Sequence, residues 1–241
     1  MRPHPLPITV LNRLFYIWIP VVSFLGLILL DFWNPALFSA IATGEDGVIE
    51  LTHIVLGFAG FVIALRLLLH YWRARNRLGI SFALFSLAVC LYITLEEASY
   101  GQHLFGWKAT GFFQEVNKQQ ETNLHNISSW FNEKPRVILE LAIILGGLLL
   151  PLFPRQVLRF VPAGLHPYAP TWIFLPTSVL VVVSRLPERL ELTGSTVFPG
   201  NIRYSEVQEL YLFLFISLYL YFVLKLETRN RATRQDASHA M

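Results

Sequence analysis

Cysteine is almost absent from this chain of 241 residues, and Cys90 is its only example. A single cysteine cannot form an intramolecular disulfide or supply a cluster of thiolates for a metal. Cys90 also lies inside a long apolar run, where a buried core side chain is expected. The scarcity of cysteine therefore excludes a disulfide-stapled domain and a thiolate metal site.

Charged residues are also scarce, at 15% of the chain, whereas 54% of the residues are hydrophobic. A soluble domain of this length would have difficulty covering its surface with so few polar groups. The chain is therefore predicted to be an integral membrane protein. Its net charge of +3 is interpreted as a sign of membrane topology, so no nucleic-acid partner is expected.

The sequence does contain several apolar runs near the ~20 residues that a helix needs to cross ~30 Å of hydrocarbon. They lie at roughly 14–33, 49–71, 78–98, 137–154, 170–186 and 206–225. The fifth run contains Pro176 and ends at Arg185, but proline is tolerated where neighbouring helices satisfy the freed carbonyl. The predicted fold is an all-α, polytopic transmembrane helix bundle of about six spans, formed by 1–226 and followed by a flexible polar tail, 227–241.

Basic residues indicate the orientation, because Lys and Arg collect in the cytoplasmic loops of membrane proteins. With a cytoplasmic N-terminus, 12 of the 19 Lys and Arg lie on the inner side, and most acidic residues lie outside. Both termini are then predicted to be cytoplasmic. The first run has no small-residue cleavage site, so it is expected to remain as an anchor.

The longest connection, about 99–136, follows the third run on the predicted outer side. A connection of this length is uncommon unless it has a function. It carries aromatic residues among polar ones, as expected for a segment in the headgroup layer. They are Phe105, Trp107, Phe112, Phe113, Trp130 and Phe131. We interpret the connection as an interfacial or re-entrant lid; the alternative is that these aromatics only surround the helix ends.

Acidic residues and histidines gather at the predicted outer ends of the apolar runs. Glu50 and His53 are spaced i, i+3 at the start of the second run, so both side chains leave one helix face. Glu206 and Glu209 repeat this spacing in the last run. The other members are Glu96, Glu97, His103, Glu121 and His125. Ionisable groups beside hydrocarbon are costly, so this clustering predicts a functional site.

A divalent metal is the simplest way to hold several carboxylates and imidazoles together near an apolar environment. These groups are ligands of zinc and of non-haem iron, and we expect zinc ahead of iron. The predicted ligands are His53, His103, His125 and Glu50. The predicted general bases are Glu97 and Glu121. The residues expected around the ligands or the substrate are Glu96, Gln102, Asn123, Arg185, Glu206 and Glu209.

A structural network of ion pairs is the main alternative to a metal site. The helix dipole favours a glutamate at a helix N-terminus, which accounts for Glu50 and Glu206 without a metal. Four arginines on the same side can pair with the acids: Arg136, Arg185, Arg189 and Arg203. Glu140, one turn after Arg136, is expected to pair with it. Binding of a ligand without chemistry is a third interpretation.

The stretch from Glu96 to Trp107 begins with an acidic pair and continues through Tyr100-Gly101-Gln102. It is followed by Asn117 and by Glu121-Thr122-Asn123-Leu124-His125-Asn126. These residues resemble a pattern of uncharacterised bacterial multi-pass membrane proteins, in which an acidic pair, an aromatic-Gly-Gln step and a Glu-x-Asn-Leu-His-Asn box recur. The resemblance implies a bacterial inner-membrane origin and no particular activity.

Ser99-x-x-x-His103 is similar to the Ser/His step of the alkaline ceramidase and adiponectin-receptor superfamily of zinc-dependent intramembrane hydrolases. That similarity implies hydrolysis of a lipid amide at a histidine-bound zinc, with Ser99 as a catalytic residue and His103 as a ligand. The chain departs from the superfamily because it has about six spans instead of seven. It also lacks a His-x-x-x-His pair in its last helix, so His125 or the Glu206 and Glu209 pair would have to substitute.

The expected function is a metal-dependent membrane enzyme, a hydrolase of a lipid or lipid-linked substrate at the outer face. A di-iron oxidoreductase is a second option because Glu50-x-x-His53 has the Glu-x-x-His form, although a second such motif is missing. A scaffold or assembly factor is the non-enzymatic option. Transport is disfavoured, because the inner halves of the second and sixth runs hold almost nothing ionisable before Arg66 and Lys225.

Overall fold

The computed structural model describes residues 9–42, 47–117, 122–123, 127, 129–191 and 204–239. Within these residues every regular element is helical, and none is a strand. Five helical segments are long and apolar enough to cross a membrane: Val10–Trp33, Val48–Arg73, Arg77–Glu97, Glu133–Leu152 and Tyr204–Thr233. The structure thus confirms the prediction of an all-α, multi-pass membrane bundle.

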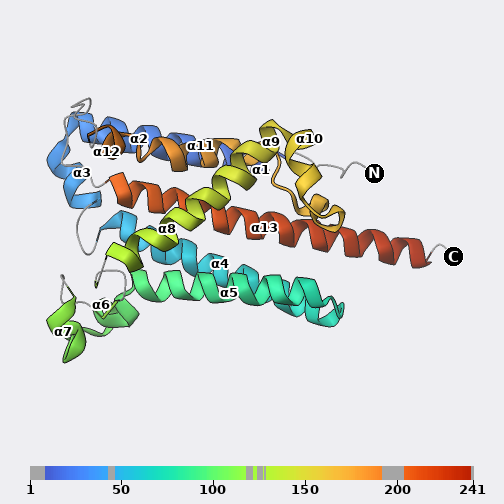
Figure 1. The fold of residues 1–241 in the computed structure, drawn as a ribbon, viewed down its shortest axis with the longest axis horizontal. Coiled ribbons are helices and arrows are strands. Elements are labelled where there is room, and N and C mark those ends of the chain that lie inside the picture. Colours follow the sequence, from blue (N-terminus) through green and yellow to red (C-terminus); the bar gives the residue numbers. More distant parts are fainter. Residues whose placement is uncertain are drawn as a thin grey trace.

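The last helix, α13 (Tyr204–His239), runs through the middle of the bundle (Figure 1). In its most apolar stretch 67% of the residues are buried inside the protein, against 11–28% in the other four spanning helices. The ring of Phe222 in α13 packs edge-on against Phe174, which in turn contacts Tyr16 of the N-terminal helical segment. The outer helices therefore bury one side against α13 and turn the other outward. α13 also continues through most of the predicted tail, as far as His239.

Helices α4 (Val48–Arg73) and α5 (Arg77–Glu97) form an antiparallel hairpin. Asn76 caps α5 by accepting a hydrogen bond from the backbone N–H of Gly79 at 3.1 Å. The two helices approach closely at glycines, as is common between membrane helices. A Cβ at Gly60 would lie 2.8 Å from Cys90 Sγ, so a side chain that is not bonded to Cys90 would push α4 and α5 apart there. α4 packs in turn on α13.

The fifth predicted run does not form one helix of spanning length. A helical turn at Trp172–Phe174 leads into α11 (Leu175–Val183), and α12 (Leu186–Glu191) follows after a short turn. Pro176 lies in the first turn of α11, where proline is well tolerated. Pro187 stops α11 from continuing, because its ring would clash with the carbonyl four residues earlier. α11 still packs inside the bundle, against α13 and α2 (Ile19–Trp33).

The predicted lid is shorter than expected, because α8 (Ser129–Ile143) begins inside it and contains Pro135. α8 continues through a π-helical segment, Ile144–Leu149, into α9 (Leu150–Leu152). The described part of the lid forms a turn at Ser99–Gly101, then α6 (Gln102–Phe105) and α7 (Phe112–Val116). α6, α7 and α3 (Pro35–Ala42) lie at one end of the bundle, and both chain termini lie at the other (Figure 1). We refer to these as the α6–α7 end and the terminal end.

Candidate functional site

Four helix ends meet at the α6–α7 end of the bundle, and each contributes a charged side chain. α4 begins close to His53, α5 ends at Glu97, and α8 carries Arg136 near its start. The first two turns of α13 contribute Glu206 and Glu209. α4 and α13 both start at this end and α5 runs antiparallel to them, which brings residues from distant parts of the sequence to one place.

His53 is completely buried, and both of its ring nitrogens face hydrogen-bond acceptors. Nδ1 lies 2.9 Å from Glu97 Oε2, and Nε2 lies 3.2 Å from the backbone carbonyl oxygen of Glu206. A neutral imidazole has only one N–H to donate. The ring can satisfy both neighbours as an imidazolium, or it can donate from Nδ1 to Glu97 and offer the Nε2 lone pair to a cation.

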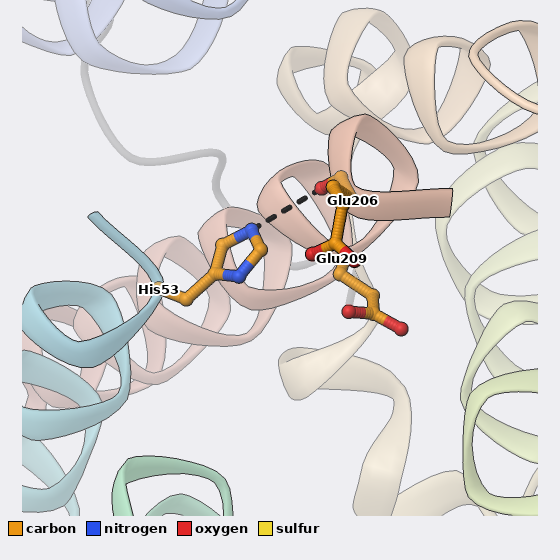
Figure 2. A group of neighbouring side chains, drawn as sticks. All are labelled: His53, Glu206 and Glu209. Carbon is orange, nitrogen blue, oxygen red and sulfur yellow. Dashed lines mark hydrogen bonds between the residues drawn. The ribbon is translucent and has the colours of Figure 1, made fainter. Parts of the chain in front are cut away.

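His53, Glu206 and Glu209 form a group that could hold a metal ion (Figure 2). One potential ligand atom from each residue lies within 4.8 Å of the others. Two ligands that each lie about 2.0–2.2 Å from a zinc ion are at most ~4.4 Å apart, so a small closing movement would complete the site. Glu97 adds the carboxylate partner that metal-binding histidines usually have on their other nitrogen.

Arg136 pairs with the candidate ligand Glu209: its Nη1 lies 2.9 Å from Glu209 Oε1. Glu140, which was expected to pair with Arg136, instead accepts two hydrogen bonds from Arg189 Nη2, at 2.7 and 2.8 Å. The prediction of an Arg136–Glu140 pair was therefore wrong. Arg136 reaches across to α13, where a carboxylate within the bundle needs a positive partner.

A left-handed turn closes the end of α5. Ser99, Tyr100 and Gly101 have φ values of 44°, 54° and 90°, which are uncommon for residues with a side chain. Asn123 donates from Nδ2 to Ser99 Oγ at 3.1 Å, and Thr122 Oγ1 donates to the Ser99 carbonyl at 3.0 Å. Ser99, predicted to be catalytic, thus accepts a hydrogen bond that holds this turn.

The same turn fixes the neighbouring polar side chains. Gln102 Oε1 accepts a hydrogen bond from Thr122 N at 2.8 Å and lies 2.7 Å from Thr122 Oγ1, whose single hydroxyl hydrogen it shares with the Ser99 carbonyl. The Tyr100 hydroxyl donates to Glu96 Oε1 at 2.7 Å. Partial burial and the Glu96 carboxylate raise the pKa of Tyr100, so this hydroxyl stays a donor at neutral pH. Glu96 is thereby held beside Glu97 at the end of α5.

An apolar cleft of about 550 Å³ leads to the charged group from between α5, α8 and α13. Phe85 and Tyr92 of α5, Leu139 of α8 and Phe213 of α13 form part of its wall. Its polar members lie at the α6–α7 end: Glu96, Glu97, Arg136 and Glu209. The volume is in the range of small-molecule sites in proteins. The cleft can therefore hold an apolar molecule whose polar part meets the charged residues.

The structure brings together only some of the residues predicted for the site. Glu121, His125 and the side chain of His103 lie outside the described residues. Glu50 lies one turn before His53, and the candidate ligand group does not include it. Arg185 binds Gln208 Oε1 at 3.1 Å and pairs with Glu188. Glu206 and Glu209, expected around the ligands, are themselves the candidate ligands.

Sequence reasoning did not assign Arg136 to the wall of a cleft, nor the apolar residues of α8 and α13 beside it. No local pattern marks these residues, because the cleft exists only through the way α8 packs relative to α5.

No protein-family model, curated protein or solved structure matches the chain. The chemistry of the site therefore has to be inferred from its own geometry.

Proposed function

We propose that this protein is a membrane-embedded, metal-dependent hydrolase that acts on a lipid or lipid-linked substrate. One observation carries the proposal: the wall of an apolar cleft between spanning helices includes Glu209, one of three potential metal ligands, and Glu97, the hydrogen-bond partner of a second one, His53. A lipid whose chain lies in this cleft would present its polar part to His53, Glu206 and Glu209. Ionisable residues within a membrane bundle are costly to keep, which favours a functional reason for them.

We assign the metal to His53 Nε2 and to the carboxylates of Glu206 and Glu209. This set keeps His53 from the four ligands predicted from the sequence, leaves out Glu50, and makes no use of His103 and His125, whose side chains lie outside the described residues. One imidazole and two carboxylates suit zinc, which we place ahead of iron. A divalent metal bound there would polarise the scissile carbonyl or phosphoryl group and make a bound water more acidic.

Glu97 is proposed to orient His53 and to act as the general base. Its Oε2 accepts the Nδ1–H of His53, which leaves Nε2 to face the metal. Its Oε1 makes no hydrogen bond to another described residue, and the side chain lines the cleft. Oε1 can therefore take a proton from water as the water oxygen bonds to the reacting centre. The same proton then passes to the leaving group, so Glu97 is regenerated.

The distribution of charge supports an outward-facing site. Lys and Arg are concentrated at the terminal end of the bundle, for example Arg73, Arg75 and Arg77 around the α4–α5 connection. By the positive-inside rule this end faces the cytoplasm. We therefore propose a bacterial inner-membrane protein with both termini inside and the site near the outer surface.

The proposal is tested with Glu97→Gln, which keeps the shape of the side chain but cannot take a proton. Membranes containing wild-type or variant protein are incubated with a total lipid extract at saturating zinc, and mass spectrometry follows the lipid species. We expect new hydrolysis products with the wild type and a loss of at least about 100-fold in their rate with Glu97→Gln. Glu115→Gln, an exposed change on α7, is the matched control and should behave as the wild type.

A scaffold without chemistry is the second candidate, and the ion pairs favour it. Arg136–Glu209 joins α8 to α13, and Arg189–Glu140 joins α12 to α8, so the site end has a fixed surface without any metal. A scaffold predicts identical lipid profiles for wild type, Glu97→Gln and Glu115→Gln, and purified protein without zinc or iron. That combined result would remove the hydrolase proposal.

A further inference from the structure

The cleft at the site is one part of a longer apolar groove. A second hollow, of about 310 Å³, shares Phe85 and Leu139 with it. A third hollow, of about 400 Å³, shares Phe82 and Tyr219 with the second and reaches Asn76 at the start of α5. Because neighbouring hollows share walls, together they follow α5 from one end to the other.

The residues of α5 that line the groove recur every three or four positions, so they form one continuous face of the helix. They include Gly79, Phe82, Ser86, Val89, Ile93 and Glu96. α5 has 21 residues, which correspond to about 30 Å of helix at ~1.5 Å per residue. This length equals the hydrocarbon thickness of a bilayer, whereas the acyl chain of one leaflet reaches about half of it.

We propose that the groove binds a polyprenyl phosphate, a lipid with an anionic head and one hydrocarbon chain long enough to cross both leaflets. The inference deepens the proposed function, because it names the substrate class of the same site. Binding itself requires neither the metal nor turnover. The chain would lie against α5 and α13, and the phosphate would lie at the α6–α7 end.

Arg136 supplies the reason for an anionic head. Its side chain is about nine-tenths buried and lines the cleft at the charged end. Nη1 is taken by Glu209, but Nε has no hydrogen-bond partner among the described residues. A buried guanidinium N–H without a partner is costly, and a turn of the Arg136 side chain toward the cleft would let a phosphate oxygen, a strong acceptor, bind it. The head would therefore be recognised beside the candidate metal ligands.

Two adjacent glycines show that the middle of the groove is open. A Cβ at Gly147 would meet Phe215 at 2.6 Å, so this residue is packed against α13. A Cβ at Gly146 would meet nothing within 4 Å, and Gly146 lines the second hollow. A large side chain at Gly146 can thus occupy the groove halfway along its length without displacing the helices.

The test uses full-length protein in nanodiscs, with a chelator present so that neither metal nor turnover affects the result. Undecaprenyl phosphate and farnesyl phosphate have the same head and differ in chain length. We expect the wild type to bind the longer lipid at least about tenfold more tightly, since more of the chain is buried. Gly146→Phe should lose this preference and keep its affinity for farnesyl phosphate, which also shows that it is folded. If Gly146→Phe does not fold, Gly146→Leu is used in its place.

Gly26→Phe is the matched control, because a Cβ at Gly26 also meets nothing within 4 Å but lies on α2, away from the groove. It should bind both lipids as the wild type does. If Arg136 binds the phosphate head, undecaprenol, which has no phosphate, should bind at least about tenfold more weakly than undecaprenyl phosphate. Equal binding of undecaprenol, or equal competition by a diacyl phosphatidylglycerol, would overturn the proposal. The proposal would also be overturned if the wild type bound neither lipid. If the wild type bound the longer lipid more tightly but hydrolysed nothing, only the proposed hydrolase would be rejected.

Discussion

His53 has an acceptor on each side of its ring, and this restricts its chemical state. Without a metal, donation to both acceptors requires a proton on both nitrogens, which would place a buried charge beside Glu97. The desolvation of such a pair costs several kcal/mol per ion before the attraction between the charges offsets it. A metal at Nε2 would replace one proton, so binding of the metal and protonation of His53 should compete.

The ligand assignment predicts different results for two residues on the same helix. His53→Ala should remove nearly all bound zinc, because it deletes the only described imidazole in the group. Glu50→Gln, one turn earlier on α4, should leave the metal content unchanged. Elemental analysis of the purified variants measures both. Equal loss of zinc from the two would return Glu50 to the ligand set that the sequence predicted.

Spacing and clustering found the members of the site but not their roles. Glu50 and His53 share a face of α4, yet spacing does not say which neighbouring helix that face meets. It meets α13, so His53 is grouped with Glu206 and Glu209. Arg136 similarly had a partner within reach on its own helix, but its long side chain extends to α13 instead. Such choices depend on burial in the assembled bundle, which no local pattern contains.

Among the elements, the α4–α5 hairpin offers the most direct test of the fold. A Cβ at Gly60 would lie 3.7 Å from the Cβ of Cys90, within the ~3.5–4.5 Å found in disulfides. Gly60→Cys should therefore cross-link to Cys90 when membranes are oxidised, which a mobility shift on non-reducing gels detects.

The control for this cross-link is Gly57→Cys, one turn away on α4. Its Cβ would face Thr94 and Ile93 and not Cys90, so little cross-linking is expected. Cross-linking of both variants to the same extent would mean that α4 and α5 slide or rotate past each other. The close packing described for the hairpin would then be incorrect.

Long apolar runs predicted the five spanning helices to within a few residues at most ends, because crossing hydrocarbon demands a length that composition alone reveals. The α8 helix was predicted to start after 136, but it begins at Ser129 and accommodates Pro135. The run at 170–186 has the composition of a span, yet its α-helix, α11, covers only Leu175–Val183, and Pro187 just beyond the run keeps α11 from continuing into α12. The apolar pattern does not show whether a proline falls where a helix tolerates it, as Pro135 does in α8, or where it stops a helix, as Pro187 does after α11.

At the scale of the whole molecule, charge separates the two ends of the bundle. The acidic candidate ligands Glu206 and Glu209 lie at the α6–α7 end, and the arginines of the α4–α5 connection lie at the terminal end. A reporter that is active only outside the cytoplasm should be active when fused after Trp107 and silent when fused after Arg231. Immunoblots should show equal amounts of both fusions. The reverse activities would place the proposed site inside the cell.

The central position of α13 also has a consequence for biogenesis. Chains are made from the N-terminus, so the helix around which the others pack is synthesised last. The α4–α5 hairpin already contains the His53–Glu97 pair, which lets these two charged groups enter the membrane together while the bundle is incomplete. Arg136 has no such partner until Glu209 emerges. Full assembly of the candidate site is therefore delayed until α13 inserts, and a ribosome stalled before Tyr204 would leave the hairpin formed and His53 apart from Glu206 and Glu209.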